Sequence, residues 1–307
     1  MRLQEEKHTF VVADLLLLVT ALVWGFGFVA QRAGMEYVGP FTFNGIRFLL
    51  GGICLLPLIW RTDQTMSAEI AAAIPSVKAG FWAGCLLFCG ASLQQVGLLY
   101  TSAGKAGFIT GLYVIFVPIF GLVLGQRTSC GTWLGALLAT IGMYFLSVRV
   151  DFTIGAGDLF VLAGAGFWAL HVLLLGYLSP RTHPVRLAMV QFLYCGLFSL
   201  IVALCFEVIS LQAIYAAAIP ILYGGLCSVG VGYTLQTVAQ RWANPAHASI
   251  LLSLEAVFAA VGGWWLLGET LSGRGLFGCV LMLAGMLFSQ LYPLLHRKRP
   301  PAVHNLR

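Results

Sequence analysis

The chain has 307 residues, of which 60% are hydrophobic and only 9% are charged, with a formal net charge of +6 and a mean hydropathy of +0.92. A soluble domain is roughly 45–50% apolar and about 25% charged, so a soluble fold of this length could not bury so much apolar surface. The composition excludes a soluble protein and predicts an all-α integral membrane protein.

A membrane-spanning helix needs about 20 mainly apolar residues, and stretches of this length follow one another along the chain. Residues 80–125 carry one charge, Lys105, and are too long for one helix, so a short turn is predicted at 101–105. No span shows an evident interruption. The predicted spans are 14–31, 41–60, 80–99, 104–125, 129–148, 157–178, 185–206, 216–240, 246–267 and 275–295.

The basic residues lie unevenly between the two sides of this topology. With the amino terminus in the cytoplasm, the cytoplasmic segments hold Arg2, Lys7, Arg61, Lys78, Arg127, Arg181, Arg186, Arg241, Arg297, Lys298, Arg299 and Arg307, and the outside turns hold Arg32, Lys105, Arg149 and Arg274. Such asymmetry predicts that both termini are cytoplasmic and that the number of crossings is even. Topology therefore explains the net charge without a nucleic-acid partner.

The two halves of the chain align with each other. A displacement of about 144 residues, and of about 143 further along, pairs Asp14 with Asp158, Trp24 with Trp168, Pro40 with Pro184, Phe48 with Phe192, Leu49 with Leu193, Gly52 with Gly196, Ala103 with Ala246, Gly135 with Gly278 and Gly142 with Gly285. We interpret residues 1–150 and 151–307 as two repeats of five helices. Because five is odd, the second repeat is inverted in the membrane, which is typical of transporters.

Several short motifs recur in the order and places expected of one family. They are Trp24-Gly25 with Phe28-Val29, Arg47-Phe48, Val117-Pro118, the run from Leu254 to Ala260, and Leu267-Gly268-Glu269 followed by Gly278 and Gly285. Over nearly its whole length the chain resembles the EamA-type branch of the drug/metabolite transporter superfamily. It departs from the family pattern at Gln126, where an acid is frequent, and at Ala256, where proline is frequent. The resemblance implies ten helices around a central cavity and substrates that include amino acids, sugars and other metabolites.

Two charged residues fall inside predicted spans, Arg47 and Glu255. A charge at membrane depth costs a few kcal/mol, so each indicates a cavity or a partner. Asn44 lies one turn before Arg47 on the same helix face. Arg47 is predicted to bind an anionic group of the substrate, and Glu255 to couple transport to protons or to balance Arg47. The structural alternative is a static ion pair.

Further polar and aromatic side chains share helix faces and predict an amide-rich, aromatic cavity for a neutral, zwitterionic or aromatic solute. They are Trp24, Phe28 and Gln31, then Gln94 or Gln95, Tyr113, Trp168 and His171, Gln191 and Tyr194, and Tyr233, Gln236 and Gln240. The alternative is that the aromatic residues pack or anchor the helices, that the glutamines join neighbouring helices and that His171 is buried and neutral. Pro118 is a candidate kink or hinge, or is simply tolerated.

Other charged groups fall near predicted helix ends, where a charge costs little. We expect Glu36, Asp151, Asp158, Glu207 and Glu269 to be solvated ends. The cluster at residues 296–299 is expected to set the orientation of the chain and to contact anionic head groups.

The sequence favours a secondary transporter, most simply an exporter, that moves a small organic metabolite across the plasma (inner) membrane by alternating access. No cofactor and no metal are expected, and a G-x-x-x-x-G-K-[ST] nucleotide-binding motif is absent. The alternatives are an intramembrane lipid-modifying enzyme and a non-catalytic channel. An enzyme of that kind would need a motif such as H-E-x-x-H, G-x-S-x-G or paired aspartates. The sequence contains none of these, so the chain is not expected to be an enzyme.

Overall fold

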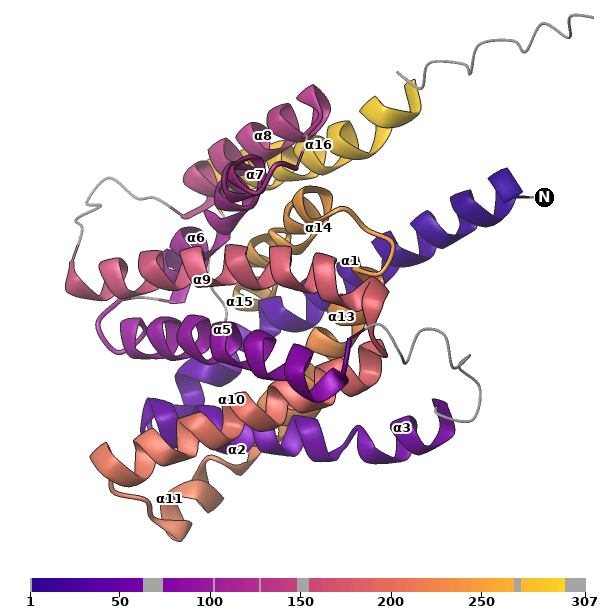
Figure 1. The fold of residues 1–307 in the computed structure, drawn as a ribbon. Coiled ribbons are helices and arrows are strands. Elements are labelled where there is room, and N and C mark those ends of the chain that lie inside the picture. The colour runs from indigo at the N-terminus through magenta and orange to yellow at the C-terminus, as the bar shows by residue number, and fades with distance from the viewer. Residues whose placement is uncertain are drawn as a thin grey trace, which may run out of the picture.

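The computed structural model describes residues 2–62, 74–101, 103–126, 128–147, 155–267 and 272–295. Within these ranges the chain forms helices and turns and contains no strand. Several predictions fall outside them: Arg127, Arg149, Asp151, the Gly268-Glu269 pair and the cluster at 296–299. The helices, shown in Figure 1, are α1 (Arg2–Gly34), α2 (Pro40–Ile53), α3 (Leu56–Thr62), α5 (Ser76–Gly97), α6 (Ala103–Gly111), α7 (Tyr113–Val123), α8 (Cys130–Ser147), α9 (Ala156–Leu178), η1 (Ser179–Arg181), α10 (Pro184–Phe206), α11 (Leu211–Ala216), α12 (Ala218–Leu222), η2 (Tyr223–Tyr233), α13 (Thr234–Ala239), α14 (Pro245–Leu252), α15 (Glu255–Leu267) and α16 (Gly273–Leu295).

Among the described residues, 8 helical segments are long and apolar enough to cross a membrane. Two shorter apolar helices, Cys130–Leu146 and Gly273–Ser289, occupy the remaining two predicted stretches. The structure confirms an all-helical protein with many candidate spans. The total of ten crossings stays a prediction.

Two predicted spans are broken near their middle, contrary to the expectation of uninterrupted helices. Leu112 separates α6 from α7, and Ser253 and Leu254 separate α14 from α15. At these points short i→i+3 hydrogen bonds replace the helical ladder: the Ile115 amide donates to the Leu112 carbonyl at 3.0 Å, and the Leu254 amide donates to the Leu251 carbonyl at 3.2 Å. The sequence does not reveal the second break because no glycine or proline lies at it.

Pro118, the predicted kink or hinge, lies inside α7 and is not at either break. The eighth predicted span is also irregular, because η2 is an 11-residue π-helix between α12 and α13. Long π-helical stretches are rare and often occur at functional sites. In this chain η2 carries residues of the central cavity described below.

Helices α8 and α16 pack side by side and antiparallel (Figure 1). A Cβ added at Gly135 would lie 2.8 Å from the Gly285 carbonyl oxygen, and one at Gly142 would lie 2.6 Å from that of Gly278. Only glycine therefore allows the two backbones to approach so closely. Since packing in the membrane depends on such contacts, these glycines hold the two short helices together.

Helices α2 and α10 form a second antiparallel pair. Gly52 packs against Leu193, and Gly196 packs against Leu49. Gly45 meets Leu200 further along the same pair. The second helix of one half of the chain is thus fixed against the corresponding helix of the other half.

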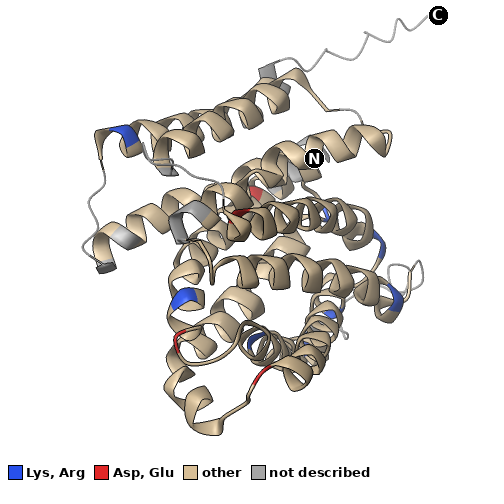
Figure 2. Ribbon diagram, turned by 90° about the vertical axis from the view of Figure 1, so that its left-hand side faces the viewer, with Lys and Arg blue, Asp and Glu red and all other residues tan. Residues whose placement is uncertain are grey.

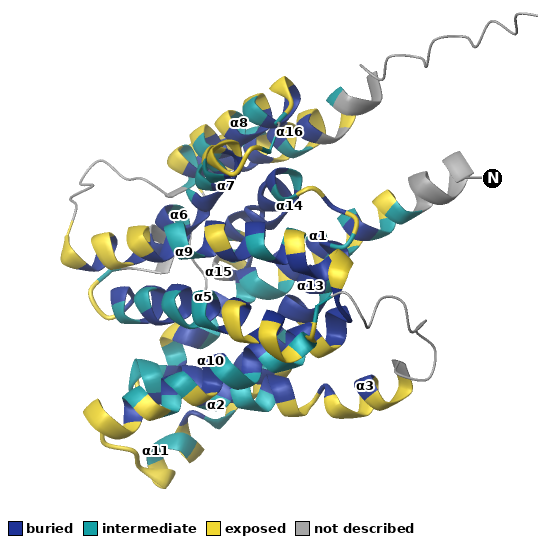
Figure 3. Cartoon of the chain, viewed as in Figure 1, coloured by how far each residue is buried: buried dark blue, intermediate teal, exposed yellow. Residues whose placement is uncertain are grey.

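The outer surface is apolar. Large side chains such as Trp60, Val123 and Trp265 are exposed, and exposed positions follow the outward faces of the helices in Figure 3. Long stretches of helix in Figure 2 contain no charged residue. A surface of this kind is suited to lipid, since a soluble protein rarely exposes large contiguous apolar patches.

Candidate functional site

A cavity of about 40 Å³ lies in the middle of the helix bundle. Residues from both halves of the chain surround it, and many of them are polar although they are buried. The lining side chains are Trp24, Phe28, Gln31, Arg47, Gln94, Thr110, Tyr113, Trp168, Val172, Ser228, Tyr233, Gln236, Leu252 and Glu255. A buried cavity with convergent polar groups is the usual form of a small-molecule site.

Arg47 on α2 is the buried cation of the cavity, with 2% of its surface exposed. Its Nε atom donates to Oδ1 of Asn44 at 3.0 Å, and its guanidinium carbon lies 4.8 Å from the centre of the Phe48 ring. Among the described residues its terminal nitrogens have no hydrogen-bond partner, and no carboxylate lies within ion-pair distance. A buried arginine so placed is ready to bind an anionic group.

Gln94 on α5 is the centre of an amide cluster at the cavity wall. Its Oε1 atom accepts from the indole nitrogen of Trp168 at 2.9 Å and from the Thr110 hydroxyl at 3.5 Å. Its Nε2 atom donates to Oε1 of Gln31 at 3.3 Å. One side chain therefore joins α1, α6 and α9 and fixes the orientation of Trp168.

Tyr233, at the end of η2, is the centre of an aromatic cluster. Its ring centroid lies 4.4 Å from that of Trp24 and 5.9 Å from that of Trp168, which is stacked on it. The Trp24 indole nitrogen donates to the Ser228 carbonyl at 3.2 Å. Such faces can bind an apolar or aromatic part of a solute.

Glu255 is the buried acid of the cavity and begins α15, directly after the break in the ninth predicted span. The hydroxyl of Tyr113, at the start of α7, lies near its carboxyl group but forms no hydrogen bond of normal geometry. The described residues contain no ion pair between Glu255 and Arg47. The static pair considered as an alternative is therefore not present in this structure.

Other cavity groups also lack partners. Oε1 of Gln236 and the hydroxyl of Tyr113 are both buried, and neither has a hydrogen-bond partner. Because an unsatisfied buried polar group costs about 1–3 kcal/mol, such groups indicate a ligand or water that completes them.

Several predicted site residues lie outside the lining. His171 and Gln191 are hydrogen-bonded to each other at 2.8 Å, and His171 packs edge-on against Trp168. Tyr194 packs edge-on against Phe81. The predicted residues that are not among the lining side chains are Asn44, Gln95, His171, Gln191, Tyr194 and Gln240. Their direct contact with a solute stays a prediction that this geometry does not favour, whereas Asn44 and His171 support lining residues.

Four lining residues were not expected. Thr110 lies three residues before Tyr113, so helical spacing could have revealed it. Ser228 and Tyr233 are five residues apart and share the cavity because η2 is a π-helix, a spacing that α-helical periodicity does not predict. Val172 and Leu252 are apolar and carry no signal that distinguishes them from lipid-facing residues.

Two acidic residues expected to be solvated ends make specific contacts instead. Asp158 is 4% exposed and accepts from the Thr101 hydroxyl at 2.6 Å. The carboxylate of Glu207 accepts from the backbone amides of Phe41 and Thr42, at 2.8 and 2.7 Å, and so caps the start of α2. The partners of both carboxylates are distant in sequence, so these contacts cannot be predicted from the residues next to Asp158 or Glu207.

The described residues contain no group of three or more His, Cys, Asp or Glu side chains that could hold a metal ion. A multi-span helical fold and an apolar outer surface define a multi-pass membrane protein, and this one has a polar cavity at its centre. Comparison with known proteins identifies it further. The model of the EamA-like transporter family matches residues 11–148 and again residues 155–291, so the chain belongs to this family and is a membrane transporter.

Relatives with assigned names agree with this class. An uncharacterized transporter of Archaeoglobus fulgidus is 31% identical over 284 residues, covering 91% of this chain and 86% of the relative. A probable amino-acid metabolite efflux pump of Salmonella typhimurium is 26% identical, covering 88% and 92%. A crystal structure with 17% sequence identity shares the fold, with a TM-score of 0.77 over 93% of this chain and 99% of the other. These names indicate a transporter rather than an enzyme.

Proposed function

We propose that this protein is a secondary transporter that exports a small organic metabolite bearing a carboxylate, by alternating access through the central cavity. The observation that carries the proposal is Arg47, a buried guanidinium that lines the cavity and has no carboxylate partner among the described residues. A buried charge without a partner is costly, so a transported anion is the simplest group to complete it.

The proposed architecture of the protein is ten helices in two inverted repeats, residues 1–150 and 151–307. Reciprocal contacts support it. Gly52 packs on Leu193 while its counterpart Gly196 packs on Leu49, and the partner helices run antiparallel. The glycine pairs of α8 and α16 are reciprocal in the same way. Such exchange of partners is what a twofold axis between two inverted halves produces.

The proposed orientation places both termini in the cytoplasm and the protein in the plasma membrane. It rests on the uneven distribution of lysine and arginine between the two sets of connecting segments.

The solute is proposed to be amino-acid-like or aromatic. Arg47 would bind its carboxylate, Glu255 and the unpaired Gln236 oxygen would accept from its amino or other donor groups, and Tyr233 and Trp168 would contact its apolar part. The breaks before α7 and α15 bring two helix starts to the cavity, as discontinuous helices do in other transporters. The printed name of the Salmonella relative is consistent with such a solute.

Proton coupling through Glu255 is part of the proposal, because one proton neutralises a buried carboxylate. The other titratable or charged groups that line the same cavity are Tyr113, Tyr233 and Arg47. We expect Glu255→Gln to bind solute but to lose transport driven by a pH gradient. Full pH-driven transport by this variant would remove Glu255 from the coupling step.

A thermal-shift screen of the purified protein tests the binding site directly. A ligand that binds only the folded state adds about 2.7 kcal/mol of stability at 100 times its Kd. We expect carboxylate metabolites to raise Tm, and their amide or ester analogues to do so much less. The shift should vanish in Arg47→Ala and Trp168→Ala. Hits retained in both variants would show that the solute binds elsewhere.

The two alternative functions predict different behaviour. A channel would carry flux that does not saturate with solute concentration, whereas alternating access saturates. A lipid-modifying enzyme would convert a lipid when purified protein is added.

A further inference from the structure

We propose that two side-chain contacts, Asp14 with His247 and Asp158 with Thr101, are the gates of the central cavity, one at each membrane face. This inference rests on the proposed alternating access and adds the residues that control it. Neither contact belongs to the cavity lining.

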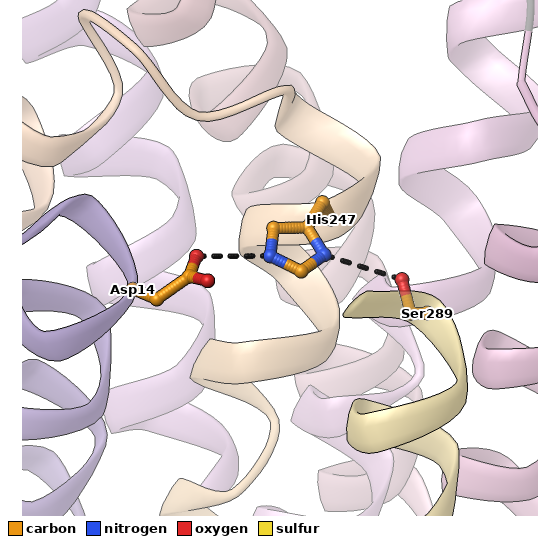
Figure 4. Close-up of polar contacts among 3 residues, drawn as sticks. All are labelled: Asp14, His247 and Ser289. Atoms are coloured by element: carbon orange, nitrogen blue, oxygen red, sulfur yellow. Dashed lines mark hydrogen bonds and ion pairs between the residues drawn. The ribbon is translucent and has the colours of Figure 1, made fainter. Parts of the chain in front are cut away.

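The first contact joins three helices, as Figure 4 shows. Nε2 of His247 on α14 lies 2.9 Å from Oδ1 of Asp14 on α1, and Nδ1 of His247 lies 3.2 Å from Oγ of Ser289 on α16. The side chains of Asp14 and His247 are largely but not fully buried, with 23% and 18% exposed. The contact therefore ties α1, the first helix of the chain, to α14 and α16, which belong to the ninth and tenth predicted spans.

The order of the three groups is that of a hydrolase triad, but catalysis is not the better interpretation. Only 2% of Ser289 is exposed, so a substrate carbonyl could not reach its hydroxyl. We therefore assign Ser289 the role of orienting the imidazole toward Asp14.

The second contact lies at the start of α9. Oδ1 of Asp158 accepts from the Thr101 hydroxyl at 2.6 Å, and Oδ2 accepts from the Gly155 amide at 2.7 Å. Thr101 belongs to the short connection between α5 and α6. The contact therefore ties the start of the sixth predicted span to the turn between the third and fourth.

The two contacts occupy equivalent places in the two halves of the chain. Asp14 and Asp158 align when the halves are superposed in sequence, and each lies near the start of the first span of its half. Thr101 lies just before the fourth span and His247 just inside the ninth, the fourth of the second half. Each half thus binds the other through the same pair of elements, as two inverted gates require.

The separation of the two contacts can be obtained from the length of α1, because one contact lies near each end of this helix. Arg32 follows Asp14 by 18 residues on this helix, about 27 Å at the helical rise, close to the thickness of the hydrocarbon core. Arg32 and Thr101 border one surface pocket, so the second contact lies at the far end of α1. Trp24 and Phe28, which line the cavity, lie between these ends. The cavity is therefore flanked by one contact on each side.

Both contacts are formed in this structure. Opening the cavity toward one side requires the contact on that side to break while the other holds. Loss of one contact should then favour the state open on its own side.

The experiment uses a cysteine placed in the cavity, Ser228→Cys, in the full-length protein. A membrane-impermeant thiol reagent is applied at one pH to right-side-out and to inside-out membrane vesicles. We expect Asp14→Ala to raise labelling from the Asp14 side relative to the opposite side by about threefold or more, the change that loss of one hydrogen bond produces. Asp158→Ala should shift the ratio by a similar factor in the opposite direction.

Matched controls identify the cause of any shift. Variants on the partner side, His247→Ala and Thr101→Val, should act like the aspartate variants on their respective sides. Glu36→Gln removes an exposed carboxylate near Thr101 and should leave the ratio unchanged. Each protein is also tested without the Ser228 substitution, because the chain has eight native cysteines.

A shift of both aspartate variants in the same direction, or no shift in either, would overturn the gate proposal. A reporter that stays unlabelled from both sides in every variant would overturn it as well. Failure of the transport proposal is separate, because it would appear as absent solute exchange while the labelling ratio still responds to the two aspartate variants.

Discussion

Arg47 is held by Asn44, whose Oδ1 accepts from the guanidinium Nε at 3.0 Å while its Nδ2 donates to the Ala91 carbonyl at 3.2 Å. Asn44 thereby connects the arginine on α2 to the backbone of α5. This hydrogen bond occupies Nε, which an end-on bidentate contact to a carboxylate does not use. The two terminal nitrogens of Arg47 therefore stay available for a carboxylate.

Substitution of Arg47 should therefore weaken solute binding more than substitution of Asn44, which only orients the arginine. We expect Arg47→Ala to weaken binding of a carboxylate solute about 10- to 100-fold, the loss of a hydrogen bond to a charged group. Asn44→Ala should weaken it about threefold to tenfold, since only orientation is lost. Binding isotherms for both variants check this order. Equal losses would indicate that Asn44 itself contacts the solute.

The glycine contacts between α8 and α16 should determine stability. In Gly142→Ala the new Cβ would lie 2.6 Å from the Gly278 carbonyl oxygen, so the helices must separate, at a cost of about 1–3 kcal/mol. Gly166→Ala on α9 is the matched control, because no atom lies within 4 Å of its added Cβ. It should be neutral or slightly stabilising. Thermal unfolding in detergent compares them, and equal Tm values would contradict the packing account.

The hydrogen bond from Trp168 to Gln94 should contribute both to stability and to the site. Trp168→Phe keeps a ring beside Tyr233 but loses the 2.9 Å bond, so we expect a loss of about 0.5–1.5 kcal/mol in unfolding free energy and weaker solute binding. Trp265→Phe changes an exposed tryptophan and should have little effect on either quantity. Identical behaviour of the two variants would argue against a role for the Gln94 cluster.

The sequence singles out the two embedded charges that line the cavity, but it misses several of the groups around them. Arg47 and Glu255 stand out because they are charges within apolar spans, and both line the cavity. Ser228 was not predicted because a π-helix brings it to the cavity, and the Asp14 contact with His247 was not predicted because the residues are 233 positions apart. Local spacing describes one helix, whereas these features depend on how distant helices meet.

Solute counterflow in proteoliposomes tests the central claim most directly. Vesicles loaded with an excess of the unlabelled carboxylate solute should accumulate labelled solute transiently, with a saturable rate, because alternating access exchanges one molecule for another. Arg47→Ala should abolish this accumulation, whereas Gly166→Ala should retain it. Labelled solute that enters at a rate independent of internal solute and proportional to its concentration, or full counterflow in Arg47→Ala, would contradict the account.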